Sequence, residues 1–187
     1  MPCVLEILML ETKLCAQDAY LALHPQSKKP VGVNWSDEGT SQEQALATNG
    51  NLGLLLGPKS DVIDVDLDCR EAKCLAQLIL PKPFAQFDRG TSDSGHYLYK
   101  AITCGPTKKF SGNSPKSTLV ELRGDGSQTM IPPSIHPDGS RLNFTDINQD
   151  APLHVSHLCC TMRPYLPAHL WLHQYQLNDQ RVTIELN

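Results

Sequence analysis

The sequence lacks several features that would define whole classes of protein. No stretch approaches the roughly 18 consecutive apolar residues of a membrane-spanning helix, and glutamates interrupt the short apolar run at the N-terminus. We therefore expect neither a membrane span nor a signal peptide. The sequence also contains no internal repeat, no low-complexity tract and no Gly-x-x-x-x-Gly-Lys-Ser/Thr phosphate loop of the kind that drives a helicase.

An excess of positive charge is also missing. The 187 residues include 16 Lys and Arg against 20 Asp and Glu, which gives a formal net charge of −4. The overall charge does not indicate a nucleic-acid partner, so any such partner must bind to a local group of basic residues. The 7 cysteines are odd in number and scattered, and they match neither a disulfide framework nor a well-spaced zinc site. They favour reduced thiols and a cytoplasmic location.

The composition that is present is that of a globular chain, with 40% hydrophobic and 19% charged residues. We expect one domain over residues 1–150, because after Asp150 the composition shifts to His, Cys, Leu and Pro. Residues 151–187 are predicted to form a short, partly helical extension, with a helix from Ala168 to Leu177.

Hydrophobic periodicity and turn residues predict an α+β domain. The predicted helices cover residues 4–23, 41–47 with Thr40 or Ser41 as the cap, and 69–80. Two antiparallel hairpins are expected, one pairing residues 52–56 with 62–67 and the other pairing 119–122 with 129–131. Further strands are predicted at 84–87, 96–100 and 142–144, and residues 103–116 are predicted to be a loop.

One predicted strand carries an unusual set of acids. Side chains alternate across a strand, so Asp64, Asp66 and Asp68 share one face while Val65 and Leu67 point the other way. Like charges this close repel one another unless something positive lies among them. Divalent cations bound by carboxylates are the commonest answer, and the strand therefore indicates a metal site.

Two further features accompany the acidic strand. The tripeptide Ser94-Gly95-His96 lies at the start of a predicted strand, and Glu121 lies inside another as Val-Glu-Leu. An acid in a strand that otherwise looks like core is costly to bury without a counter-ion. Glu121 would therefore suit a third metal ligand.

In this order the motifs resemble those of the archaeo-eukaryotic primase superfamily, and within it the bifunctional DNA primase/polymerase (Prim-Pol) N-terminal domain. The family pattern is an Asp-x-Asp or Asp-x-Glu after hydrophobic residues, then Ser-x-His, then a hydrophobic residue followed by an acid. Residues 62–68, 94–96 and 120–121 look like these three motifs. Flanking segments that fall in the expected order are Lys29-Pro30, Arg123-Gly124 and Pro132-Pro133-Ser134.

The resemblance implies a primase-polymerase, RRM-like core of mainly antiparallel strands with flanking helices. It also implies template-directed nucleotidyl transfer from nucleoside triphosphates on a single-stranded DNA template, in the replication of a mobile element, phage or bacterium, with a helicase supplied by a separate chain. Two Mg²⁺ or Mn²⁺ ions would be held by the acids, to lower the pKa of the attacking 3′-hydroxyl and to stabilise the leaving pyrophosphate.

Several residue roles follow from the resemblance. Asp66, Asp68, Glu121 and His96 are the expected catalytic residues, and Asp64 joins the three acids as a candidate metal ligand. Ser94, His96, Arg123 and Lys108 are the expected nucleotide contacts.

Some alternatives stay open at this stage. The family needs two acids where three alternate, so the pair is either Asp66 with Asp68, which we favour, or Asp64 with Asp66. Arg123 could instead pair with Glu121 or Asp125. The rival functions are a catalytically inert remnant that binds nucleotide or single-stranded DNA, and a metal-dependent nuclease.

Overall fold

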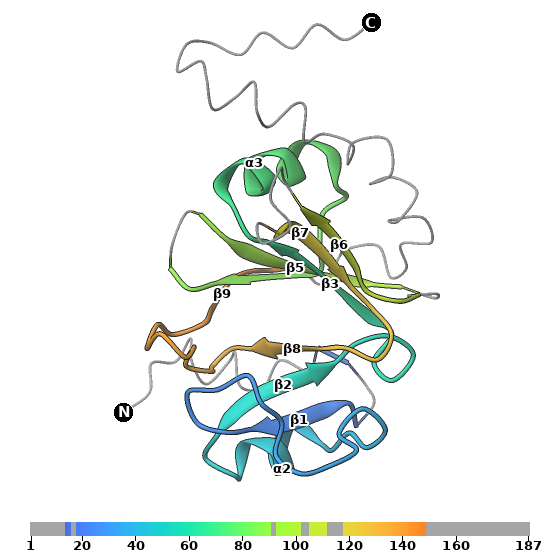
Figure 1. Cartoon of the computed structure of the whole chain (residues 1–187), viewed down its shortest axis with the longest axis vertical. Coiled ribbons are helices and arrows are strands. Elements are labelled where there is room, and N and C mark those ends of the chain that lie inside the picture. The colour runs from blue at the N-terminus through green and yellow to red at the C-terminus, as the bar shows by residue number, and fades with distance from the viewer. Residues whose placement is uncertain (1–13, 16–17, 91–92, 102–104, 112–117, 149–187) are drawn as a thin grey trace, which may run out of the picture.

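The computed structural model describes residues 14–15, 18–90, 93–101, 105–111 and 118–148. Over these residues the chain forms two antiparallel sheets, one above the other, with one helix on the outer side of each (Figure 1). The larger sheet contains six strands in the order β6 (Lys108–Ser111), β7 (Thr118–Arg123), β3 (Val62–Leu67), β5 (Gly95–Lys100), β4 (Ala85–Asp88) and β9 (Asn143–Ile147). The smaller sheet contains β1 (Tyr20–Leu23), β2 (Asn51–Leu55) and β8 (Gln128–Ile131).

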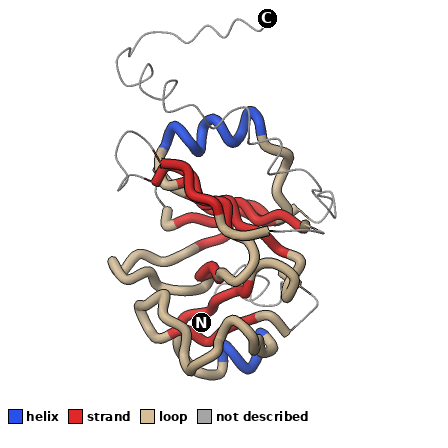
Figure 2. Tube along the Cα trace, turned by 45° about the vertical axis from the view of Figure 1, so that its right-hand side comes forward, coloured by secondary structure: helices blue, strands red, loops and turns tan. Residues whose placement is uncertain are grey.

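The two helices complete a layered arrangement, which Figure 2 shows from the side. Helix α3 (Arg70–Ile79) covers the outer face of the six-stranded sheet, and α2 (Gln42–Leu46) lies against the three-stranded sheet. The mainly antiparallel α+β architecture that the sequence predicts is confirmed.

Two hydrophobic cores hold these layers together. One lies between α3 and the six-stranded sheet, where Val65 and Leu67 of β3 join Ala72 and Ala76 of α3. The other lies between the two sheets and includes Leu54 of β2. Because the central strands of the six-stranded sheet are covered on both faces, acids on the inner face of β3 are buried.

Both described helices were predicted, and local capping explains where they begin and end. Ser41 is the N-cap of α2, and its hydroxyl accepts a hydrogen bond from the backbone N–H of Gln44 in a capping box. Cys69 is the N-cap of α3, and the helix ends just before Pro81, which cannot continue it.

Both predicted hairpins are wrong, because each turn carries the chain from one sheet to the other. Strand β2 pairs with β1 and β8, whereas β3 pairs with β5 and β7. The two turns that connect the sheets lie side by side at Gly57 and Asp125. Gly57 has a φ of +90°, and a Cβ atom added to it would come within 2.6 Å of Asp125 Oδ1, so only glycine fits. A Gly-, Pro- or Asp-rich turn signals a change of direction, but it does not specify which strand the chain joins next.

Two other predictions need correction. Residues 20–23 form β1 rather than the end of a helix, because pairing with β2 overrides the helical propensity of Leu and Ala. The predicted loop 103–116 contains β6, an exposed edge strand whose polar residues follow no alternating pattern. The strands predicted at 84–87, 96–100 and 142–144 are confirmed to within a few residues as β4, β5 and β9. The helix at 168–177 and the start of the opening helix lie outside the described residues.

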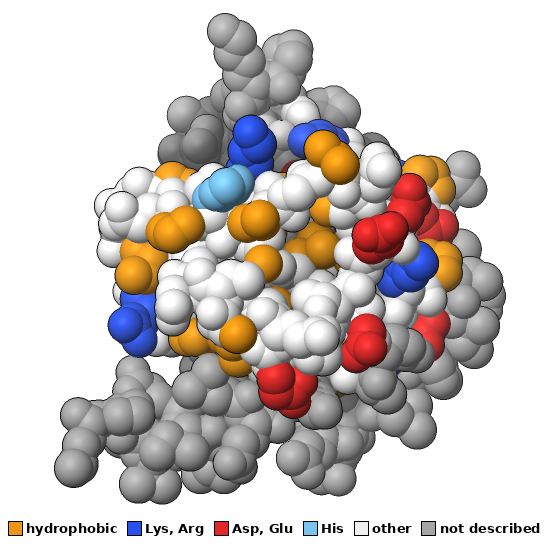
Figure 3. Space-filling model, turned by 90° about the horizontal axis from the view of Figure 1, so that it is seen from below, with side chains coloured by type: hydrophobic (Ala, Val, Ile, Leu, Met, Phe, Trp, Pro, Cys, Tyr) orange, Lys and Arg blue, Asp and Glu red, His pale blue; other side chains and the backbone are white. Residues whose placement is uncertain are grey.

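The lower surface of the molecule offers no concentrated basic patch among the described side chains. Figure 3 shows that hydrophobic side chains are scattered singly over this face and that acidic side chains gather toward one side of it. In the described part of the chain, no helix is long and apolar enough to cross a membrane. The positive charge that could meet a phosphate is found instead between the sheets.

Candidate active site

The candidate site lies on the face of the six-stranded sheet that is turned toward the three-stranded sheet. On β3, Val65 and Leu67 pack beneath α3, while Asp64 and Asp66 point to the opposite face. The residues Asp64 and Asp66 are only 0% and 5% exposed. Buried carboxylates are unfavourable unless they are paired with positive charge, so their partners define the site.

The strand register brings the three motifs together at one point. Asp66 lies opposite His96 of β5 on one side and opposite Glu121 of β7 on the other. Asp64, two residues earlier, lies opposite Arg123. Directly opposite residues in antiparallel strands have neighbouring side chains, so acids and bases that are distant in sequence meet on three adjacent strands.

His96 is held between the two acids of β3. Its Nδ1 lies 2.9 Å from Asp64 Oδ2, and its Nε2 lies 3.6 Å from Asp66 Oδ1. The imidazole is also stacked on Phe87, with ring centroids 4.5 Å apart. Burial by itself would lower the pKa of His96, but the charges of Asp64 and Asp66 outweigh burial and raise it above its ordinary 6.5. The imidazole is thereby fixed in position and biased toward its charged form.

Arg123 is the second cation at the site, and it contacts three acids. One guanidinium nitrogen, Nη2, lies 2.5 Å from Asp66 Oδ2 and 3.3 Å from Glu121 Oε2. The other, Nη1, lies 3.9 Å from Asp64 Oδ2. The Arg123 side chain is 18% exposed. Of the sequence-based alternatives for Arg123, the structure shows the pairing with Glu121.

The two buried aspartates have opposite pKa shifts. Burial favours the neutral form of both, but at Asp64 the His96 and Arg123 charges prevail and lower the pKa. Thr129 also lies near Asp64 and makes the smallest contribution to the lowered pKa. Its buried Oγ1 has no hydrogen-bond partner among the described residues. At Asp66, burial together with the neighbouring negative charges raises the pKa. The charged form of Asp64 is thus stabilised by its ion pairs. The nearby positive charges do not fully offset the unfavourable burial of charged Asp66 and its repulsion by neighbouring acids.

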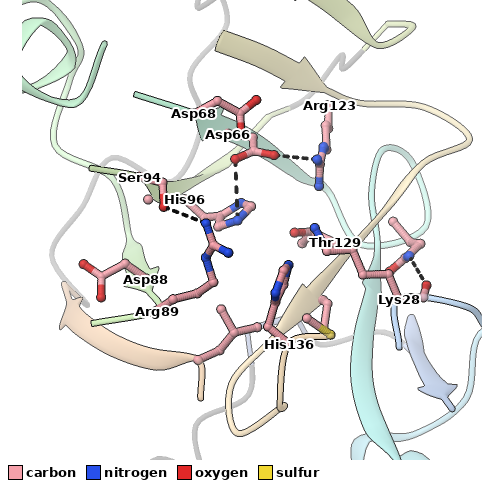
Figure 4. A pocket seen from close by; sticks show the side chains of 14 residues that line it. Lys28, Asp66, Asp68, Asp88, Arg89, Ser94, His96, Arg123, Thr129 and His136 are labelled. Carbon is pink, nitrogen blue, oxygen red and sulfur yellow. Dashed lines mark hydrogen bonds and ion pairs between the residues drawn. The ribbon is translucent and has the colours of Figure 1, made fainter. Parts of the chain in front are cut away.

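A pocket opens in front of this cluster, between the two sheets (Figure 4). Its lining mixes acids and bases, because Asp66, His96 and Arg123 all come from the six-stranded sheet, and β8 of the smaller sheet adds further residues. The pocket-lining acids are Asp66, Asp68 and Asp88; the bases are Lys28, Arg89, His96, Arg123 and His136; and β8 supplies Gln128, Thr129 and Met130. An opening with both signs of charge suits a ligand that carries anionic groups together with bound cations.

The Ser94 segment is fixed from two sides. Lys73 of α3 donates to the Asp88 carboxylate at 3.0 Å and to the Ser94 backbone oxygen at 3.1 Å. Arg89 donates to the Ser94 hydroxyl at 3.4 Å and to Asp138 at 2.8 Å (Figure 4). Ser94 and His96 are therefore presented to the pocket by anchored backbone rather than by a free loop.

The remaining predicted residues differ in their placement. Asp68 follows β3 directly, is exposed, and lines the pocket with Asp66. Glu121 lies behind them, bound by Arg123 and by Lys109 Nζ at 3.4 Å. Lys108 is on the exposed edge strand β6 and is not among the pocket-lining residues.

Sequence reasoning gave no functional role to Arg89, Thr129 or His136, yet all three line the pocket. Arg89 comes directly after β4 and starts the loop that leads to Ser94. This position next to the Ser-x-His motif could have identified Arg89 from the sequence. Thr129 is 1% exposed and has no such signal, because its sequence context is that of an ordinary core strand.

The donor chemistry fits a hard divalent cation. Asp66, Asp68 and Glu121 supply carboxylate oxygens, the ligands that Mg²⁺ and Mn²⁺ prefer. As they stand, no three His, Cys, Asp or Glu side chains of the described residues are arranged to hold a metal ion. The reason is visible at the centre of the cluster, where Arg123 already contacts Asp66 and Glu121. In this arrangement the guanidinium, rather than a metal ion, neutralises these two acids.

Comparison with known proteins agrees with this geometry. A family model described as bifunctional DNA primase/polymerase, N-terminal, matches residues 6–155. No curated protein matches the chain. The family match spans both sheets and includes every residue of the site described above.

Proposed function

The chain belongs to the bifunctional DNA primase/polymerase family, and on this premise we propose that it adds nucleotides to a DNA primer on a single-stranded template. The observation that carries the proposal is the meeting of Asp66, His96 and Glu121 on three adjacent strands, where Asp66 and His96 line the pocket and Glu121 lies behind them. Each of these residues comes from a different motif. Together they place metal-binding oxygens next to a phosphate-binding imidazole.

We assign the divalent metals to Asp66, Asp68 and Glu121. When bound there, Mg²⁺ or Mn²⁺ would lower the pKa of the primer 3′-hydroxyl and stabilise the leaving pyrophosphate. Asp66 with Asp68 is the better-supported pair, because both line the pocket. Asp64 is 0% exposed and committed to His96, which suits a supporting residue rather than a ligand.

His96 is proposed to bind a phosphate oxygen of the incoming nucleotide. Asp64 accepts the Nδ1–H hydrogen bond, which leaves Nε2 as the nitrogen on the pocket side. The charges of Asp64 and Asp66 raise the pKa of His96 and so favour its charged form, whose Nε2–H can donate to an anionic oxygen. Asp64 acts here as a positioning residue through His96.

The basic wall of the pocket is proposed to hold the rest of the triphosphate. This wall is formed by Lys28 and Arg89, and Ser94 offers a hydroxyl that accepts a hydrogen bond from Arg89. A guanidinium can bind two phosphate oxygens at once, which orients the nucleotide as well as attracting it. Lys108 lies outside this wall, so its assignment as a nucleotide contact has no support from the geometry.

The wider context follows from the family. We propose that the six-stranded sheet with α3 is the RRM-like catalytic core. We also propose that the protein works in the cytoplasm, in the replication of a mobile element, phage or bacterium.

A primer-extension assay with Mn²⁺, deoxynucleoside triphosphates and a labelled primer on a single-stranded template tests the proposal. The parent chain should extend the primer only when the template is present. Asp66→Asn should lower the rate by roughly a hundredfold or more, because several kcal/mol of metal-derived stabilisation is lost. Asp146→Asn is the matched control, since Asp146 is 43% exposed on β9 and contacts only Lys82; it should leave the rate unchanged.

The same experiment separates the rival functions. Degradation of the labelled DNA without added triphosphates would identify a nuclease. Binding of triphosphate with no incorporation would identify an inert nucleotide-binding domain. Equal incorporation by the parent and by Asp66→Asn would remove Asp66 from the mechanism.

A further inference from the structure

The guanidinium of Arg123 sits where the family's divalent metals would need to bind. Its Nη2 contacts Asp66 Oδ2 at 2.5 Å and Glu121 Oε2 at 3.3 Å, and Nη1 reaches to within 3.9 Å of Asp64. His96, the other basic side chain of the cluster, contacts Asp64 and Asp66, which both lie on β3. Arg123 therefore bridges the acid of β3 and the acid of β7.

A guanidinium and a divalent cation cannot share this position. A metal ligated by a carboxylate lies at about 2.0–2.6 Å from the oxygen, which is the distance range that Nη2 already occupies at Asp66. Two cations that close would also repel each other strongly inside a buried site. A metal that bridges Asp66 Oδ2 and Glu121 Oε2 therefore requires Arg123 to leave.

The surroundings give Arg123 a place to go. Its side chain lines the pocket (Figure 4), so the guanidinium can leave the acids for the pocket without opening either hydrophobic core. In its present position it neutralises carboxylates whose burial is otherwise unfavourable. It thereby stabilises the metal-free fold and opposes metal entry.

We propose that Arg123 is a built-in competitor that sets the affinity of the metal site, holding the acids until a divalent ion displaces it. This inference rests on the proposed function for the identity of the ligand. If metal binds only to molecules in which Arg123 has left the acids, the apparent dissociation constant for the metal equals the intrinsic constant divided by the fraction of such molecules. Charge-assisted hydrogen bonds of this kind correspond to roughly tenfold to hundredfold in that constant.

The matched control is Lys109. Its Nζ also pairs with Glu121, at 3.4 Å, but its side chain is 63% exposed and reaches only that one acid. If loss of any nearby positive charge tightened metal binding, Arg123→Met and Lys109→Met would behave alike. If occupancy of the metal position matters, only Arg123→Met has a large effect.

The test is a Mn²⁺ titration of the full chain, with free Mn²⁺ measured by electron paramagnetic resonance. We expect Arg123→Met to bind Mn²⁺ roughly tenfold to hundredfold more tightly than the parent, and Arg123→Lys and Lys109→Met to stay within about threefold of it. Asp66→Asn should lose the site. Unchanged or weaker binding by Arg123→Met, with binding still dependent on Asp66, would overturn the inference and leave the proposed function standing. Absence of any Asp66-dependent binding would overturn both.

A second measurement on the parent chain covers the case in which Arg123→Met does not fold. The Nε–H signal of Arg123 can be assigned by comparison with the spectrum of Arg123→Lys. Its exchange with solvent should speed up on addition of Mg²⁺, because the guanidinium leaves the acids for the open pocket. An unchanged exchange rate at saturating Mg²⁺ would overturn the inference.

Discussion

The two faces of β3 have opposite physical roles although they are built from alternate residues of one strand. On the outer face, Val65 and Leu67 are buried against α3 and need no partner beyond apolar contact. On the inner face, Asp64 and Asp66 are buried just as deeply but depend on His96 and Arg123. The outer face contributes to stability through the hydrophobic effect, whereas the inner face contains charges whose burial is unfavourable.

This difference shows where function resides in the molecule. A protein that needed only to fold could replace the inner acids together with His96 and Arg123 by apolar residues of similar size at no loss of stability, as is often found for whole buried ion pairs. The presence of four charged groups between the two sheets is better explained if these groups act on a ligand. The two faces should therefore respond differently to substitution.

The largest effect expected on stability comes from the outer face. Leu67, at 1% exposure, leaves a cavity when it is shortened, so Leu67→Ala should lower the free energy of unfolding by about 2–5 kcal/mol. Asp66→Asn should change it by less than about 1.5 kcal/mol, because the amide oxygen still accepts a hydrogen bond from Arg123. Urea unfolding of both variants measures the contrast. Equal destabilisation would mean that the inner face is structural.

The second prediction concerns the charge of His96. In Asp64→Asn the pKa of His96 should fall, because burial is no longer outweighed by the nearest negative charge. In the parent the pKa is raised, so the stability contributed by charged His96 is complete below about 6.5 and is lost as the pH rises through the raised value. Titration of the imidazole by nuclear magnetic resonance measures this, with Asp146→Asn as the control. An unchanged pKa in Asp64→Asn would show that Asp64 does not hold His96.

The smallest effects should come from the rim of the pocket. Arg89 lines it with a side chain that is 33% exposed, so Arg89→Gln should raise the KM for the nucleotide by roughly three- to tenfold. Lys108→Gln, on the edge strand, should change KM by no more than about twofold. Steady-state primer extension distinguishes them. If Lys108→Gln had the larger effect, the nucleotide would bind across β6 rather than between the sheets.

Much of the inner face could be predicted from the sequence, because period-2 alternation is a local property. The sequence places Asp64 and Asp66 on one side of a strand and Glu121 inside another, and the structure agrees. The partners of these residues could not be predicted, since cross-strand register depends on contacts far apart in sequence. Arg123 shows this most clearly, because its three acids come from two strands.

The arrangement of the strands into two sheets could not be predicted from the sequence either, because it also depends on contacts between residues far apart in the chain. The turns at residues 57–61 and 124–127 have the composition of hairpin turns, yet each leads from one sheet to the other. The choice between a hairpin and a crossing is decided by how the two cores pack. Thr129 enters the pocket wall only because β8 joins the smaller sheet, so its part in the site is invisible locally.

The central claim is that the charged face of β3 is a divalent-metal site used in nucleotide transfer. A crystal structure of the chain with Mn²⁺ and a non-hydrolysable deoxynucleoside triphosphate tests it most directly, because anomalous scattering locates the metal independently of the protein. We predict a Mn²⁺ peak bonded to Asp66, with the guanidinium of Arg123 turned away into the pocket. A nucleotide bound with no Mn²⁺ at Asp66, or with Arg123 still holding Asp66 and Glu121, would contradict the account.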